Sequence, residues 1–320
     1  MLIHGRLNEF ADLPVVDFTE GGVRRNGEAL DAPPAGVAWR VRVEQTEGSF
    51  GRVFDRFLEV VDPGSVTALV IGWWEYYGGP GDRSDVTAEL VAAADRLKNL
   101  RSLFVGDVVV EEREISWIPL VDIGPIVTAY PRLERLGLRS GEEPAVEGQR
   151  LRPFRGAHLR ELWFESGGLP GELVRAVAAS ELPALERLEM WLGMENYGGD
   201  ATVADLAPIL SGERLPALRH LGLQDSEIQD EIAAAVAQAP IVARLETLAL
   251  SMGTLSDTGA EALLAGQPLT HLRSLDLHHH YLSEAMEARV RAALPGVRVD
   301  LSEGNGHSGD DDDRWVMVSE

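Results

Sequence analysis

The chain has 320 residues and 34.8 kDa, with 45% hydrophobic and 25% charged residues, which is typical of a globular protein rather than a disordered one. Its 52 acidic against 29 basic residues give a formal charge of −23, which argues against nucleic-acid or anionic-membrane binding because phosphate contacts need a basic face. The absence of cysteine and the single lysine, Lys98, exclude disulfides, thiolate chemistry and a phosphate-binding G-x-x-x-x-G-K-[ST] loop.

The first 61 residues predict one strand and one amphipathic helix. Residues 19–35, rich in Gly, Pro and charge, predict a loop. The segment Trp39–Glu44 alternates as a strand does. The segment Phe50–Val61 places six apolar side chains on one helical face: Phe50, Val53, Phe54, Phe57, Leu58 and Val61.

Residues 62–302 contain an apolar pattern, L-x-x-L-x-L, that recurs at spacings of 26 to 34 residues. Such a period is typical of a repeat protein, in which each unit buries its apolar face against the next. The first positions of the copies are Val66, Leu100, Leu133, Leu159, Leu185, Leu218, Leu245 and Leu272, with a further degenerate copy at Val299.

Helical segments lie between several copies, so each unit should be a strand, a loop, a helix and a loop. Examples are AELVAAADRL after Thr87, GELVRAVAAS after Pro170 and EAMEARVRAAL after Ser283, where serine suits an N-cap. Residues 139–156 instead predict a polar loop in place of a helix.

The pattern resembles the leucine-rich repeat in its long, helix-containing form, as in ribonuclease-inhibitor-like proteins. That resemblance implies an α/β solenoid, a horseshoe of about eight to nine repeats with a parallel concave sheet and convex helices, capped by residues 1–61. The position that holds asparagine in this repeat holds Gly167, Gly193, Ser226, Gly253 and His280 here.

The whole chain also resembles an uncharacterised family of bacterial leucine-rich-repeat proteins. The residues that carry this resemblance are LPVVDF at 13–18, EISWI at 114–118, FESGGLP at 164–170, LHHH at 277–280 and the tail RWVMVSE. Members of that family are encoded near radical-SAM and ATP-grasp-like enzymes and bring no assigned activity. The resemblance therefore implies a partner in a modification pathway.

Residues 303–320 form an acidic, Gly-rich tail in which RWVMVSE could add an edge strand. Gly304, Gly306 and Gly309 match G-x-G-x-x-G, but four aspartates follow where a dinucleotide site needs a helix N-terminus. We therefore expect no cofactor. No basic segment followed by an apolar run opens the sequence and no stretch approaches the roughly 20 apolar residues of a membrane helix, so we expect a cytoplasmic protein without a membrane partner.

The concave strand face is the predicted binding surface, because its side chains are regularly spaced and are not needed for the core. Two tryptophans beside carboxylates are unusual on a surface that binds nothing, which favours a binding role. The alternative to a binding role is that these rings pack on one another or beneath a loop. The residues in these columns are Phe104, Arg139, Trp163, Glu165, Glu189, Trp191, Gln224, Asp276 and His278.

The histidine run 278–280 raises the question of a metal site. Asp276 and His278 share one strand face, whereas His279 points the other way and His280 falls at the asparagine position. With only two converging ligands, we expect no metal, and Asp276, His278 and His280 are the weak candidates.

The sequence favours a non-catalytic scaffold that holds a basic or neutral protein or peptide on its concave face. The alternative is a metal-dependent or acid–base enzyme, or an accessory protein, that uses Asp276 and His278 together with carboxylates near the strand ends. Those carboxylates are Asp107, Glu111, Glu165 and Glu195. The partner's identity and the oligomeric state do not follow from the sequence.

Overall fold

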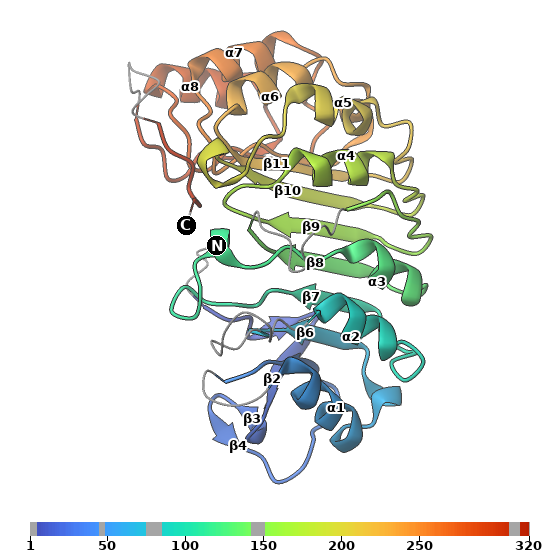
Figure 1. The fold of residues 1–320 in the computed structure, drawn as a ribbon. Helices are drawn as coiled ribbons and strands as arrows, with labels where there is room; N and C mark the ends of the chain where they lie inside the picture. Colours follow the sequence, from blue (N-terminus) through green and yellow to red (C-terminus); the bar gives the residue numbers. More distant parts are fainter. Residues whose placement is uncertain (1–4, 45–48, 75–84, 142–150, 307–313, 320) are drawn as a thin grey trace. The chain divides into compact units, whose positions relative to one another are not determined.

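The computed structural model describes residues 5–44, 49–74, 85–141, 151–306 and 314–319. Contacts divide the chain into two compact units, Met1–Leu159 (unit 1) and Arg160–Glu320 (unit 2). In each unit, parallel strands lie side by side in chain order, and the helices that connect them follow one side of the sheet (Figure 1).

In unit 1 the strands β2, β5, β6, β7 and β8 are parallel, and β3, β4 and β1 add antiparallel pairs at the β2 side. The strands are β1 Glu9–Phe10, β2 Leu13–Thr19, β3 Gly22–Arg25, β4 Glu28–Ala29, β5 Ala38–Val41, β6 Ala68–Ile71, β7 Ser102–Val105 and β8 Arg135–Arg139. The helices are α1 Phe50–Val60, α2 Val86–Ala92 and α3 Ile123–Ala129, with short 3-10 turns at Pro63–Ser65 and Ile115–Trp117.

The loop predicted over residues 19–35 is wrong in its first half, because β3 and β4 form a hairpin there. Asn26 and Gly27 connect them with φ of +52° and +82°. Asn-Gly is the pair that two-residue hairpin turns favour, because both turn residues need positive φ. The hairpin signal was therefore present but was outweighed by the Gly, Pro and charge content of the whole segment.

The amphipathic helix predicted at Phe50–Val61 is confirmed as α1, and all six of its predicted core side chains are buried. Their rings pack closely: Phe57 lies 5.4 Å from Phe18 of β2 and 5.7 Å from Trp39 of β5, between ring centroids. Because β2 pairs in parallel with β5 and β5 pairs in parallel with β6, the N-terminal segment continues the repeat sheet as well as covering it.

In unit 2 the strands run in the order β14-β13-β12-β11-β10-β9, all parallel. They are β9 Glu161–Glu165, β10 Arg187–Gly193, β11 His220–Ser226, β12 Thr247–Ala249, β13 Ser274–Asp276 and β14 Arg298–Asp300. The helices are α4 Gly171–Ala179, α5 Val203–Ser211, α6 Gln229–Val236, α7 Asp257–Ala265 and α8 Glu284–Ala293, with 3-10 turns at Glu195–Tyr197 and Pro240–Arg244. Ser283 caps α8 as predicted, since its Oγ accepts a hydrogen bond from the Met286 N–H at 3.2 Å.

The recurring leucines form the core between strands and helices. In successive strands of unit 2, Leu162, Leu188, Leu221, Leu248 and Leu275 lie in register and are 0–1% exposed. Strand, loop and helix repeat in chain order around these residues. The chain is therefore an α/β leucine-rich-repeat solenoid.

At two of the positions where the repeat lacks asparagine, another side chain accepts a backbone hydrogen bond in the turn. The Ser226 Oγ and the His280 Nδ1 accept hydrogen bonds from backbone N–H groups two residues on, at Ile228 and Leu282 (3.3 and 3.1 Å). His280 is fully buried and burial lowers its pKa, so the neutral ring acts as a structural acceptor. Of the predicted loop at 139–156, residues 142–150 lie outside the described residues.

The C-terminal segment, residues 314–319, does not extend the sheet. It crosses the end of β11 and the loops that follow β12 and β13. Val318 donates its N–H to Asp225 Oδ1 (2.9 Å), Met317 donates to Met252 O (2.7 Å), and Trp315 donates to Tyr281 Oη (2.9 Å). Val316 and Val318 are buried against these loops, which explains why the segment leaves the edge of β14 uncovered by a further strand.

Candidate functional site

The strand face of unit 2 that lies opposite the helices presents a regular array of polar side chains. Alternate residues of a strand point to the same face, and the parallel register aligns them across strands. One row is Glu161, Arg187, His220, Thr247, Ser274 and Arg298, and the next is Trp163, Glu189, Gly222, Ala249, Asp276 and Asp300. In the third row, Trp191 lies beside Gln224.

The two central positions of the second row are small, and a hollow of about 470 Å³ opens over one of them, Ala249. Gly222 and Ala249 separate Glu189 on one side from Asp276 and Asp300 on the other. The hollow is lined mainly by charged and hydroxyl-bearing side chains: Arg187, Glu189, His220, Thr247, Ser274, Asp276, Arg298 and Asp300.

Glu189, His220 and Thr247 form a hydrogen-bonded chain at one wall of the hollow. The His220 Nε2 lies 2.8 Å from Glu189 Oε1, and its Nδ1 lies 2.5 Å from Thr247 Oγ1. Arg187 also pairs with Glu189 Oε1. Burial raises the pKa of Glu189, but the hydrogen bond from His220 and the charge of Arg187 outweigh it and hold the pKa below its ordinary value.

A second network holds Asp276 at the opposite wall. Asp276 Oδ1 accepts hydrogen bonds from the backbone N–H of His278 (3.0 Å) and from its Nδ1 (2.8 Å). That hydrogen bond raises the pKa of His278 despite partial burial. The Ser251 Oγ approaches Asp276 Oδ2 at 3.4 Å and in turn accepts a 2.8 Å hydrogen bond from Gln224 Nε2.

The structure brings six of the nine predicted binding residues onto this face as half-buried side chains: Trp163, Glu165, Glu189, Trp191, Asp276 and His278. Gln224 belongs to the same array but is only 6% exposed. Phe104 and Arg139 lie in unit 1 and are 1% and 5% exposed, so neither offers a binding surface there.

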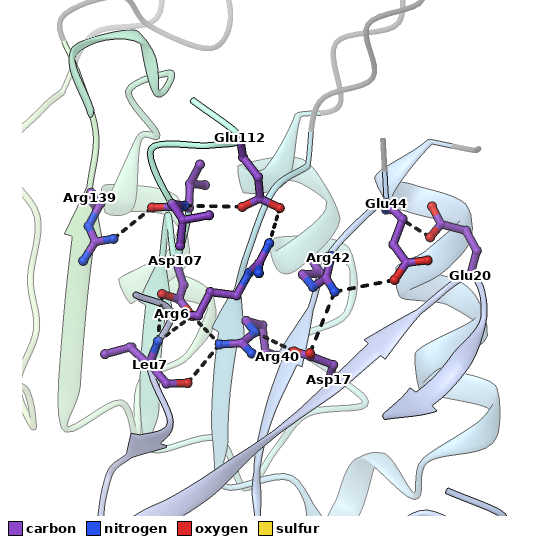
Figure 2. Close-up of polar contacts among 12 residues, drawn as sticks. Arg6, Leu7, Asp17, Glu20, Arg40, Arg42, Glu44, Asp107, Glu112 and Arg139 are labelled. Atoms are coloured by element: carbon purple, nitrogen blue, oxygen red, sulfur yellow. Dashed lines mark hydrogen bonds and ion pairs between the residues drawn. The ribbon is translucent and has the colours of Figure 1, made fainter. Parts of the chain in front are cut away.

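The N-terminal segment of unit 1 explains why Phe104 and Arg139 are covered. Phe10 lies against Phe104, with 6.4 Å between ring centroids. The Cζ atom of Arg139 lies 5.7 Å from the centroid of the Phe104 ring. Leu7 is held by both oxygens of the fully buried Asp107, each 3.2 Å from its N–H, and by Arg40 Nη1, which donates to its carbonyl at 2.9 Å (Figure 2).

The same arginine closes a buried ion-pair network. Arg40 donates to Asp17 Oδ1 at 2.5 Å and to Asp107 Oδ2 at 2.7 Å, and Arg6 pairs with Glu112 above them (Figure 2). Burial alone would lower the pKa of Arg40, but the two aspartates raise it above its ordinary value. The strand face of unit 1 is therefore occupied by the chain's own N-terminal segment.

The weak metal candidates do not converge. Asp276 and His278 contact each other, whereas His280 is fully buried with its Nε2 3.3 Å from Leu301 O. Across the described ranges, no three His, Cys, Asp or Glu side chains are grouped to hold a metal ion.

The carboxylates predicted near the strand ends do not form one site. Asp107 is committed to Arg40 and Leu7 inside unit 1, and Glu111 is exposed in the same unit. Glu165 and Glu195 belong to unit 2, where Glu195 is exposed and Glu165 is half-buried.

Sequence reasoning missed His220, Thr247 and Arg187, which precede the predicted columns by two residues. The signal was available, because residues two apart in a strand share a face. The predicted columns lie after the second leucine of each repeat and therefore omit the row before it.

Comparisons with known proteins bear on the fold. No family model matches the chain, and no curated protein matches it. Among solved structures, it is similar to a protein of Bacteroides fragilis, a Northeast Structural Genomics Consortium target, at 29% identity with a TM-score of 0.75 over 88% of this chain and 78% of that one. The similarity thus extends over most of both chains.

Two other solved structures show weaker similarity. The TLR13–ssRNA13 complex matches at 14% identity and a TM-score of 0.39, over 84% of this chain and 38% of that one. An internalin (inlF) of Listeria monocytogenes matches at 11% identity and a TM-score of 0.31, over 83% and 74%. The leucine-rich-repeat architecture is confirmed by the chain's own strands and repeats, and the narrower bacterial family stays a prediction.

Within the described residues, no helix combines the length and the apolar character that crossing a membrane requires.

Proposed function

We propose that the protein is a non-catalytic scaffold that binds a protein or peptide partner on the strand face of unit 2. The observation that carries the proposal is the hollow over Ala249, which is rimmed by ionisable side chains. Trp163 and Trp191 lie on the same strand face, next to Glu189 and Gln224 in the strand register. Tryptophan combines a large apolar ring with a hydrogen-bond donor and is enriched among residues that dominate binding energy.

Charge supports a basic or neutral partner. The formal charge of −23 attracts a basic partner and speeds its encounter with the surface. The resemblance to the bacterial repeat family adds the expectation that this partner belongs to a modification pathway.

The test is partner capture by full-length variants from lysate of the cells that express the protein. Trp163→Ala and Trp191→Ala should each reduce capture at least about tenfold, the effect of a residue worth 1.4 kcal/mol or more, because half-buried rings at a binding surface contribute mainly to the complex. Their thermal midpoints should stay near that of the unmodified protein.

Trp117→Ala is the matched control, because Trp117 is 58% exposed in unit 1, on a different element. It should capture the partner normally. Undiminished capture by the Trp163 and Trp191 variants, or their unfolding, would contradict a binding role for this face.

A second candidate, an acid–base enzyme, is favoured by the Thr247–His220–Glu189 chain alone. A hydroxyl, an imidazole and a carboxylate in this order resemble the activated nucleophiles of acyl-transfer sites. Hydrolysis of p-nitrophenyl acetate discriminates the two functions. Turnover that is lost in both Thr247→Val and His220→Gln would support the enzyme, and equal rates in all three proteins would reject it.

A further inference from the structure

We propose that the hollow in unit 2 is an anchor pocket for an arginine side chain of the bound peptide. The inference rests on the proposed function and adds the chemical identity of the group that enters the site. It follows from the acceptors, the spacing and the small residues that line the hollow.

The two walls carry carboxylate oxygens with remaining capacity to accept hydrogen bonds. Glu189 Oε1 is used by Arg187 and His220, whereas Oε2 accepts none from the described part of the chain. Across the hollow, Asp300 Oδ1 accepts from Ser302 N–H at 3.0 Å, and Asp300 remains exposed. Hydrogen bonding holds the pKa of Asp300, like that of Glu189, below its ordinary value, so both are ionised at neutral pH.

A buried amide oxygen without a hydrogen-bond partner lies beside one wall of the hollow. Gln224 is only 6% exposed, and its Oε1 has no hydrogen-bond partner. A Cβ built on Gly222 would lie 2.7 Å from this oxygen and 2.9 Å from Glu189 Cγ, so both side chains lean over the glycine. An unpaired buried acceptor is costly, and this oxygen lies next to Glu189, which lines the hollow.

The spacing favours a guanidinium over an ammonium. Glu189 and Asp276 lie in the same row with two strands between them, which separates their backbones by roughly 14 Å. Their side chains reach into this space from both ends. A guanidinium carries N–H donors along both edges of a rigid plane and can contact both walls, whereas an ammonium is a compact point charge.

The cations in the hollow are placed away from its centre. Arg187 is paired with Glu189, and Arg298 is on the outermost strand, β14. Between them, the first row offers the His220 ring, which is hydrogen-bonded to Glu189 and Thr247, and the Thr247 and Ser274 hydroxyls. The carboxylates of Glu189 and Asp276 repel each other, as the contribution of Asp276 to raising the pKa of Glu189 shows, and a bound cation would relieve that repulsion.

The experiment selects peptides from a phage-displayed random library on the full-length protein. We expect enrichment of arginine at one fixed position. A synthetic consensus peptide should then bind at least about tenfold more weakly when that arginine is replaced by citrulline, which keeps the shape but removes the charge.

Matched double variants connect the effect to the hollow. In Glu189→Gln/Asp276→Asn, the arginine and citrulline peptides should bind with similar affinity. In Glu172→Gln/Glu213→Gln, which removes the same charge from exposed positions outside the strands, the arginine preference should persist. Circular dichroism verifies that both variants fold.

The outcomes separate the inference from the proposed function. Enriched peptides without a basic position, whose binding still requires Trp191, would overturn the arginine pocket and leave the scaffold function intact. A preference for arginine that survives Glu189→Gln/Asp276→Asn would also overturn it. No enrichment of any peptide would count against both.

Discussion

Single backbone positions decide how closely neighbouring repeats approach. Gly193 has a φ of +69°, and a Cβ there would lie 2.0 Å from Gly167 O. Only glycine combines that conformation with that clearance. A glycine at the asparagine position therefore does more than omit a polar side chain. At Gly193 it allows the backbone to lie in direct contact with the backbone of Gly167.

The Asp276–His278 pair gives a prediction about pH. Because the hydrogen bond to Asp276 raises the pKa of His278, its titration followed by NMR should have a midpoint above the ordinary 6.5, and Asp276→Asn should lower that midpoint. The stability that the pair contributes is fully present below about pH 6.5 and is lost as the pH rises through the folded-state pKa.

Glu172→Gln, on the exposed side of α4, serves as the control and should leave the His278 midpoint unchanged. An unchanged midpoint in Asp276→Asn would mean that the hydrogen bond does not govern this histidine.

Residue-level prediction succeeded where strand alternation alone sets the direction of a side chain. Trp163, Glu189, Trp191 and Asp276 all lie on the face expected for them. It failed for Phe104, because the residues that cover it, around Phe10, are almost a hundred positions away in the sequence. No local pattern encodes that contact.

At the scale of elements, the C-terminal segment depends on one buried acid. Asp225 is fully buried, and its Oδ1 accepts the Val318 N–H while Oδ2 has no partner. Burial raises its pKa well above the ordinary value of 3.8. The folded protein therefore prefers the protonated acid, and ionisation at higher pH opposes folding around this segment.

The contribution of Asp225 to the free energy of unfolding should therefore be most favourable below about pH 4. It should become less favourable as the pH rises toward the folded-state pKa of Asp225. Asp225→Asn keeps the acceptor for Val318 but cannot ionise. At neutral pH it should raise the free energy of unfolding, because burial no longer has to oppose the ionisation of a carboxyl group at this position.

Denaturant unfolding at several pH values measures this effect. The exposed Asp95→Asn should retain the pH dependence of the unmodified protein. If Asp225→Asn is less stable at neutral pH than the unmodified protein, the ionised form of Asp225, and not the protonated form, holds the C-terminal segment.

Element prediction followed the apolar periods. The helices at α1, α4 and α8 were recoverable because each combines an apolar face with an identifiable start. The β3–β4 hairpin was missed because its four-residue and two-residue strands are too short for alternation to stand out, leaving Asn26 and Gly27 as the main signal.

For the whole molecule, the repeat pattern was sufficient to predict the architecture. Its leucines are the residues that the sheet and helices enclose, so their spacing carries the fold directly. The hollow was not predictable in the same way, because it depends on which residues of the neighbouring strands lie adjacent to Ala249. That adjacency exists only once the register is known.

The two units also use their strand faces differently. In unit 1 the face is covered by the chain's own residues around Leu7 and Phe10, held by the Arg40 network. In unit 2 the corresponding face holds the hollow. A repeated architecture thus provides one face that contacts the chain's own N-terminal residues and another that carries an open hollow.

The hollow opens over the short side chain of Ala249, and this makes it separable from every charged group around it. A larger aliphatic residue at Ala249 would fill the space from its floor while leaving Glu189, Asp276 and the hydrogen bonds of the strands in place. An allele of this kind would allow genetics to distinguish a cell that lacks the interaction from one that lacks the protein.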